Sequence, residues 1–236
     1  MKEQLEKQRE FNHAAMAYLR IWLRTDRSAL ARISTCKKNS DEDGMARELH
    51  EIAKKYKVVR GISARDDYGQ ELTKVERTQR WLEISRIVQA AAEKEGDSHV
   101  LVCQLSDDLK EFSSQKRADT QESYSLISLS SKLLWFFPKT KVKIYDSLAV
   151  KALKHEMGYQ KNNGYVGYER CWKACIKKYK QELDFSIKEL PGFFAWSSVP
   201  YELHDEACKV ISRRWFRERV FDQYLVSRAN VLPQSA

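Results

Sequence analysis

The spacing of apolar residues near the start of the chain is the feature that most restricts its fold. Apolar residues recur there at three- and four-residue steps, which places them on one face of an α-helix. The stripe lies within residues 4–37 and contains Phe11, Ala14, Ala15, Tyr18, Leu19 and Trp22. Only 8 Gly and 4 Pro occur in 236 residues, and all-β folds need more turn residues than that. We therefore expect a mainly α fold.

The same spacing predicts further helices. One is expected over residues 45–56, and another over 73–94, where Thr73 and Glu76 have the spacing of a capping box. Residues 99–105 fit either a strand or the start of a buried helix, because a short apolar run has no decisive period. Further helices are predicted over 124–137, 147–157, 167–183 and 202–228.

The length of the chain fits one ordinary domain or two small lobes. The polar stretch 116–123 (Lys-Arg-Ala-Asp-Thr-Gln-Glu-Ser) has the composition of a connector. We expect a single mostly helical domain, 1–236, with possible lobes at about 1–117 and 118–236.

The charge balance points to an anionic partner. There are 42 Lys and Arg against 33 Asp and Glu, a formal net charge of +9, and the isoelectric point is about 9.2. Nucleic acid is the commonest partner of such a chain. The alternative is a basic protein with no such partner, because net charge does not show where the charges cluster.

Cysteine usage and hydropathy indicate a cytoplasmic protein, which we expect to be a monomer. Five cysteines at irregular spacing favour reduced thiols over a disulfide framework. The first residues are charged and lack the apolar core of a signal peptide. No apolar run approaches the ~20 residues of a membrane span, so we expect no membrane partner.

The segment 128–147 holds the residues with the clearest chemistry. An apolar helix is expected to stop before Pro138, because proline disfavours helix at the preceding residue. Three lysines, Lys139, Lys141 and Lys143, follow in a basic loop, and Asp146 then precedes the next helix. A carboxylate at a helix N-terminus is favoured in its ionised form by the helix dipole. Asp146 is therefore either a simple helix cap or an anion held beside a phosphate-binding loop, whose lysines are otherwise ordinary solvated residues.

This segment resembles the helix-hairpin-helix DNA glycosylases, especially small prokaryotic proteins related to the 8-oxoguanine DNA glycosylase fold. The matching residues are Ser131-Lys132 and Ile144-Tyr145-Asp146-Ser147. The close match covers about 30 residues, within a helix-hairpin-helix-like element near residues 121–150. The resemblance implies two helical lobes flanking a DNA-binding cleft, with DNA as the partner.

The resemblance also implies a reaction, the removal of a damaged or modified base from DNA. Asp146 would be the catalytic aspartate, stabilising the sugar cation or orienting water, and the target base would be flipped out of the duplex. The expected substrate is an oxidised purine; the alternative is a hypermodified phage base, which would place the protein in antiviral defence.

The sequence also departs from the family pattern. The Leu-Pro-Gly-x-Gly hairpin is absent from 122–128, and Ile127 stands where bifunctional members have their lysine. Lys132 is the other candidate catalytic group, as a Schiff-base nucleophile or as an ion pair or phosphate contact. Base excision without strand cleavage is therefore the prediction.

Other residues are candidates for DNA contact. Ser131, Tyr145 and Ser147 flank the expected catalytic groups. Arg213, Arg214 and Arg217 form the densest basic cluster, which fits either phosphate contact or a solvated helix face.

We expect no cofactor. The chain has no Gly-rich phosphate loop and no dinucleotide fingerprint, which argues against a nucleotide cofactor. Cys171 and Cys175 are four residues apart, but no third and fourth metal ligands are evident, so no metal is expected. Two alternatives to an enzyme remain, a non-catalytic DNA-binding helical module and a helical protein that binds an acidic protein partner.

Overall fold

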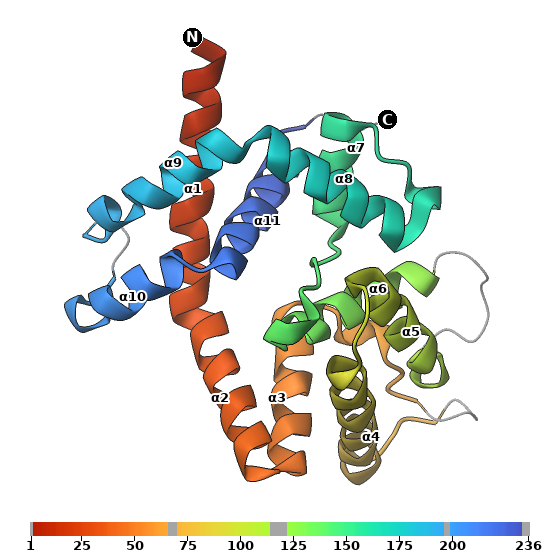
Figure 1. Cartoon of the computed structure of the whole chain (residues 1–236). Helices are drawn as coiled ribbons and strands as arrows, with labels where there is room; N and C mark the ends of the chain where they lie inside the picture. The colour runs from red at the N-terminus through yellow and green to blue at the C-terminus, as the bar shows by residue number, and fades with distance from the viewer. Residues whose placement is uncertain (1, 66–69, 114–121, 196–198, 233–236) are drawn as a thin grey trace. The chain divides into compact units, whose positions relative to one another are not determined.

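The computed structural model describes residues 2–65, 70–113, 122–195 and 199–232 (Figure 1). Helices follow one another through these ranges. Within them, β pairing is limited to two isolated bridges, Ile62 with Ser113 and Arg65 with Glu71. The prediction of a mainly α fold is confirmed. No described helix is both long enough and apolar enough to cross a membrane.

The helices have well-defined bounds. The α-helices are α1 (Lys2–Ile21), α2 (Arg27–Asn39), α3 (Glu42–Lys55), α4 (Lys74–Glu93), α5 (Ser98–Asp108), α6 (Glu122–Trp135), α7 (Ser147–Met157), α8 (Gly164–Lys178), α9 (Lys180–Glu189), α10 (His204–Ile211) and α11 (Arg214–Val231). A π-helical turn, η1 (Trp22–Asp26), joins α1 to α2. Short 3-10 turns are η2 (Val59–Gly61), η3 (Lys110–Phe112), η4 (Pro138–Thr140), η5 (Lys161–Asn163), η6 (Leu190–Phe193) and η7 (Tyr201–Leu203).

The chain divides into two compact units. The terminal unit is Met1–Arg27 with Asp146–Ala236, and the central unit is Ser28–Tyr145. This division differs from the expected lobes, 1–117 and 118–236, whose boundary lies in 114–121, outside the described residues. The reason is a long-range pairing, because α1 packs against α11 and so brings the first and last helices into one unit. Local composition contains no signal of that pairing.

The terminal unit is built around α11, which packs on α1 and α7, while α9 packs on α1 and α8 on α7. Its core is rich in buried aromatic rings, and the rings of Phe11 on α1 and Tyr224 on α11 stack with centroids 4.1 Å apart. Stacked pairs of this kind add stabilisation beyond the burial of apolar area. The fully buried large aromatic side chains of this unit are Phe11, Tyr18, Trp22, Tyr159, Tyr165, Tyr168, Trp172, Phe216, Phe221 and Tyr224.

A buried polar network crosses the same core. Tyr18 donates its hydroxyl to Asp26 at 3.0 Å, and Trp172 donates its indole N–H to Asp222 at 2.7 Å. The Arg219 guanidinium lies 3.1 Å from the Asp222 carboxylate and 3.8 Å from that of Asp26. Buried charges are tolerated only when they are paired in this way.

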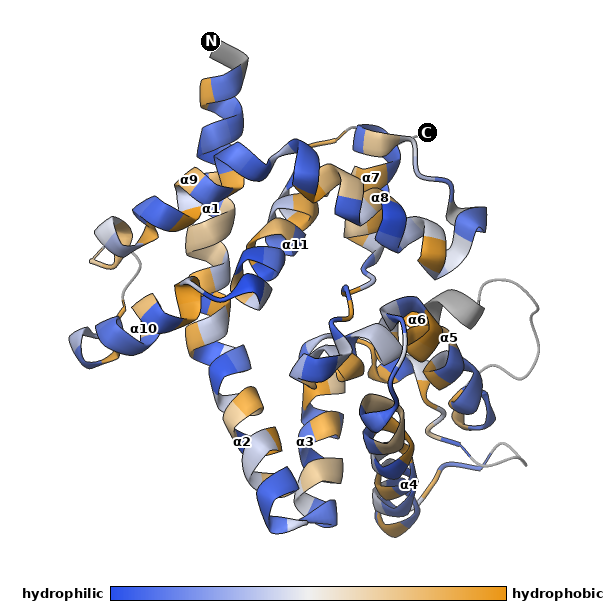
Figure 2. Ribbon diagram, viewed as in Figure 1, coloured by the Kyte–Doolittle hydropathy of each residue, from blue (hydrophilic) through white to orange (hydrophobic). Residues whose placement is uncertain are grey.

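The central unit contains consecutive helix pairs, α3 with α4, α4 with α5 and α5 with α6. Much of α6 is apolar, as its orange colour in Figure 2 shows. The predicted capping box at the start of α4 is confirmed. Glu76 donates its backbone N–H to Thr73 Oγ1 at 3.3 Å, and Thr73 donates its own to Glu76 Oε2 at 2.7 Å.

Three predicted elements need adjustment. Residues 99–105 lie inside α5 and are therefore helical, not a strand. The helix expected over 167–183 is interrupted at Tyr179. The helix expected over 202–228 is divided because Arg213, between α10 and α11, has an extended backbone with φ −77° and ψ 141°. Apolar spacing continues across both breaks, so periodicity alone does not reveal them.

Candidate functional site

The segment that joins α6 to α7 has the predicted order of elements. Helix α6 ends at Trp135, the 3-10 turn of Pro138–Thr140 follows, and α7 begins at Ser147. The bounds predicted for the helix 147–157 are confirmed. Helix α6 belongs to the central unit and α7 to the terminal unit, so the helix-hairpin-helix arrangement and the DNA-binding cleft stay predictions.

Asp146 caps α7. Its backbone is extended, with φ −132° and ψ 140°, and its Oδ1 accepts the backbone N–H of Leu148 at 2.9 Å. This is the geometry of an N-cap, in which a side-chain oxygen satisfies a backbone donor of the first turn. The side chain is half-buried, and Ser147 beside it is exposed. The carboxylate is therefore fixed at the helix end without being sealed in the core.

Two serines of α6 hold the residue that precedes Asp146. Tyr145 donates its backbone N–H to Ser131 Oγ at 2.9 Å, and Ser131 donates its hydroxyl to the Ser128 carbonyl at 3.1 Å. Ser128 in turn donates its hydroxyl to the Tyr145 carbonyl at 3.0 Å. We call this arrangement of Ser128, Ser131 and Tyr145 the serine bracket. The bracket gives hydrogen-bond partners to the N–H and the C=O of Tyr145, a buried residue that lies in no helix or sheet.

The serine bracket changes the interpretation of two predicted DNA-binding residues. The Ser131 side chain is 0% exposed and Tyr145 is 4% exposed. Neither is therefore placed to touch DNA from solvent in this structure. Residue type alone does not predict this burial, because a serine that binds phosphate and one that binds a backbone N–H are the same in sequence. Ser131 instead positions Tyr145, the last residue of the central unit.

Lys132, the second candidate catalytic residue, lies on α6 next to Ser131 and is 5% exposed. A lysine this deeply buried is uncommon, since its charged form is costly to remove from water. Burial also distinguishes it from an ordinary surface lysine that contacts phosphate. In the sequence it directly follows Ser131, a member of the serine bracket.

The predicted basic loop presents two lysines and not three. Lys139 and Lys141 are exposed, whereas Lys143 is 3% exposed. Lys141 has a left-handed backbone, with φ 52°, and follows the 3-10 turn directly. The chain then enters a buried stretch without regular secondary structure that leads to Tyr145, and Lys143 is buried within it.

The predicted arginine cluster is partly neutralised. Arg214 pairs with Glu218 at 2.9 Å, and Arg217 pairs with Asp184 of α9 at 2.7 Å. Arg213 is exposed, and no ion pair joins it to a described residue. Pairing with carboxylates weakens the case that Arg214 and Arg217 hold phosphates, because a phosphate would have to replace the existing partner.

The cysteine pair on α8 is not arranged as a metal site. Cys175 is buried, and burial, reinforced by the charge of Glu156, raises the pKa of its thiol to about 12. Metal ligation needs the thiolate. Among the described residues, no group of three or more His, Cys, Asp or Glu side chains could hold a metal ion.

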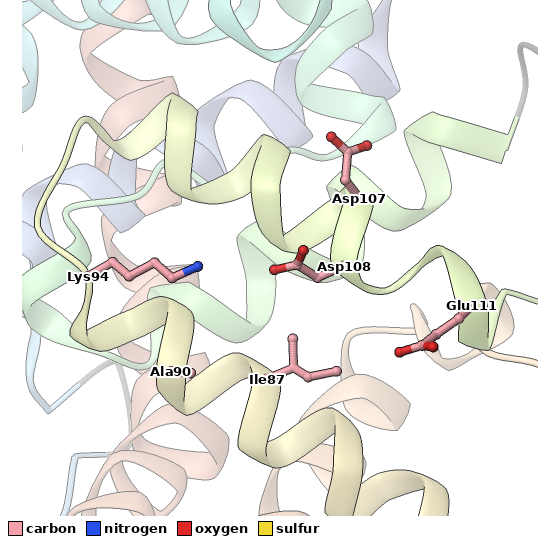
Figure 3. A pocket seen from close by; sticks show the side chains of 6 residues that line it. All are labelled: Ile87, Ala90, Lys94, Asp107, Asp108 and Glu111. Atoms are coloured by element: carbon pink, nitrogen blue, oxygen red, sulfur yellow. The ribbon is translucent and has the colours of Figure 1, made fainter.

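A hollow of about 520 Å³ lies on the central unit, between α4 and the end of α5 with η3 (Figure 3). Figure 3 shows Lys94 extending toward Asp108 across this hollow. This hollow is not predictable from the sequence, because its walls come from different helices. Its acidic rim is unsuited to a phosphate backbone. The lining residues are Ile87, Ala90, Lys94, Asp107, Asp108 and Glu111.

Comparison with protein-family models, with curated proteins and with solved structures finds no match to this chain. The functional interpretation therefore depends on the residues and their geometry.

Proposed function

We propose that the protein removes a damaged or modified base from DNA by hydrolysing its N-glycosidic bond, with Asp146 as the catalytic carboxylate. The observation that supports this most is the way Asp146 is held. One carboxylate oxygen caps α7, the side chain stays half-exposed, and the serine bracket fixes the residue before it. Electrostatic catalysis requires such preorganised charge, since a mobile group would have to be ordered during the reaction.

The chemistry follows from charge. As the bond between C1′ and the base nitrogen breaks, its electron pair leaves with the base and the sugar becomes cationic. A fixed carboxylate stabilises that cation or orients a water molecule toward C1′. The water oxygen then bonds to C1′, one of its protons is released, and the departing base takes up a proton. The product is an abasic site, and the target nucleotide must leave the base stack to reach Asp146.

Lys132 raises the alternative of a reaction with a lysine nucleophile. A deprotonated amine could instead attack C1′ and displace the base, which leaves with the electron pair of the N-glycosidic bond. Breaking the bond between C1′ and the ring oxygen would then give a Schiff base, which leads to strand cleavage. The lysine is buried on α6, and the family position for such a nucleophile is Ile127. The monofunctional reaction is therefore proposed, and borohydride trapping decides the point, because only a Schiff base yields a covalent adduct.

The proposed substrate is duplex DNA that carries an oxidised purine, with a hypermodified phage base as the alternative within the same class. The net charge of +9 supports DNA as the partner. Lys139 and Lys141 are exposed before the turn into Asp146, where they can meet phosphates.

One observation favours a second candidate function. The contact between Asp146 and Leu148 N–H is by itself a complete helix cap, which a non-catalytic DNA-binding module would share. Asp146→Asn separates the two functions, because asparagine caps a helix about as well as aspartate does but lacks the charge.

The test is to incubate the protein with modified oligonucleotides and phage genomic DNA, and to count abasic sites by alkali-induced strand breaks. The native chain is expected to produce them, and Asp146→Asn is expected to bind DNA normally while excision falls by at least about 100-fold, the scale of one lost electrostatic contact. Asp41→Asn makes the same exchange at the N-cap of α3, where Asp41 accepts the backbone N–H of Gly44; it is the matched control and should retain activity. Absence of abasic sites with every substrate would refute the proposed glycosylase activity. Equal excision by Asp146→Asn and the native chain would refute the catalytic role of Asp146.

A further inference from the structure

Helix α8 has a buried face that packs into the core and an exposed face that carries basic residues. Its buried positions include Tyr165, Tyr168, Trp172 and Cys175, which belong to the core of the terminal unit. Figure 2 shows polar and apolar segments alternating along this helix. The period of three to four residues therefore leaves a second set of side chains on the solvent face.

Three basic residues occupy that solvent face. Arg170, Lys173 and Lys177 are all exposed and follow one another at three- and four-residue steps; we call them the α8 basic face. The only acidic residue of α8, Glu169, is buried and lies 3.1 Å from Lys173 Nζ. Glu169 thus pairs with the middle cation of the face, and Arg170 and Lys177 lie on either side of that pair.

Two of these cations lack a carboxylate partner. No ion pair joins Arg170 or Lys177 to any residue in the described ranges. Arg214 and Arg217 differ in this respect, because each is paired with an acid. An unneutralised charge on a rigid helix is the better phosphate ligand, since binding replaces only water and counterions.

We propose that the α8 basic face binds the phosphate backbone of duplex DNA. The inference rests on the proposed function and adds a contact surface that the motif around Asp146 does not contain. Arg170 and Lys177 are seven residues apart, about 10 Å along a helix that rises 1.5 Å per residue. Along the duplex axis, where each strand carries one phosphate per 3.4 Å of rise, that distance corresponds to about three base-pair steps.

The position of α8 in the terminal unit supports this assignment. Helix α8 packs on α7, and Asp146 caps α7. The backbone contact and the proposed catalytic carboxylate thus belong to the same compact unit. Backbone contacts position a protein on the duplex, while other groups act on the base.

The test is the double variant Arg170→Ala/Lys177→Ala, in which alanine preserves an exposed helix. Its matched control is Lys37→Ala/Lys110→Ala, which removes two exposed lysines of the central unit and changes the net charge equally. Affinity for an unmodified duplex is measured between 50 and 300 mM salt. Losing two phosphate contacts is expected to lower the slope of log K against log salt by about 1.8, and the affinity at 0.1 M salt by about 60-fold.

The outcomes separate the two proposals. An unchanged affinity, or an equal loss in the control, overturns the α8 basic face. The proposal is also overturned if the native protein does not bind DNA but binds anionic lipid vesicles or an acidic protein. If no substrate yields abasic sites while duplex binding still depends on Arg170 and Lys177, the glycosylase proposal fails and the surface stands. If excision occurs and the double variant binds like the native chain, the surface alone fails.

Discussion

Adjacent serines on α6 offer a matched test of the serine bracket. Ser130 and Ser131 are both 0% exposed, and both can be replaced by alanine with the loss of one oxygen. Ser131 Oγ accepts the Tyr145 N–H and donates to the Ser128 carbonyl. Ser130 Oγ has no hydrogen-bond partner within the described residues. The two substitutions therefore remove the same atom from the same helix but have opposite consequences for hydrogen bonding.

The expected magnitudes follow from that difference. Ser131→Ala leaves the buried Tyr145 N–H without an acceptor, which costs about 1–3 kcal/mol of unfolding free energy. Ser130→Ala removes a buried hydroxyl that makes no bond, so its effect should lie between zero and a gain of about 1 kcal/mol. The Ser128 carbonyl also loses the Ser131 hydroxyl as a donor, but this costs less, because the carbonyl still accepts a backbone N–H within α6.

Denaturant titration measures both variants. Ser131→Ala should lower the midpoint without changing the slope m, because the surface exposed on unfolding is unchanged. In a thermal scan, each lost kcal/mol corresponds to about 2–4 °C for a chain of this size. If the central unit unfolds separately, the loss is expected in that transition. Equal losses in Ser130→Ala and Ser131→Ala would refute the reasoning, because hydrogen bonding would then not explain either effect.

Further predictions concern the central unit. Thr73→Ala should lower the unfolding free energy by about 1 kcal/mol, because it removes the cap of α4. Thr78→Ala removes a hydroxyl that donates to the Lys74 carbonyl within the helix, and it should be neutral or slightly stabilising. Chemical denaturation compares the two variants, and an equal loss of stability would contradict the capping argument. His50 stacks on Trp81 with centroids 4.6 Å apart, and burial, followed by the charge of Lys54, lowers its pKa below the ordinary 6.5. The unfolded chain therefore takes up this proton first, so unfolding free energy should decline as pH falls from 6.5 toward the lowered value. His50→Gln should remove that part of the pH dependence in denaturant titrations at several pH values, and an unchanged profile would show that His50 does not cause it.

Local signals in the sequence were the most informative. The bounds of α7 and the capping box at Thr73 were predictable, because a cap involves residues within one helical turn of each other. The break at Tyr179 was not predictable, since the buried positions continue from Cys175 to Leu183 across it. A local pattern specifies an inward face but not whether the helix axis is continuous.

Contacts between distant residues account for the features of the candidate site that the sequence did not reveal. Burial of Lys143 and the pairing of Arg217 with Asp184 both depend on where separate elements meet. The role of Ser131 depends on the return of the chain at Tyr145, fourteen residues later. None of these contacts has a spacing that a single sequence displays. The α8 basic face, by contrast, follows a helical period, and its significance becomes visible only once burial divides the helix into two faces.

Capping and catalysis make compatible demands on Asp146. The Leu148 N–H engages Oδ1, and a carboxylate has about four acceptor positions on its two oxygens, so one cap bond leaves its negative charge in place. A cap contact fixes the side-chain rotamer, and this fixed orientation is what electrostatic stabilisation of a cationic sugar requires. The cap is therefore no argument against catalysis by Asp146. What distinguishes an enzyme from a binding module is the negative charge, because asparagine reproduces the cap and the shape but cannot stabilise a cation. The proposal consequently depends on the charge of one side chain, and the Asp146→Asn variant tests that charge with the helix cap intact.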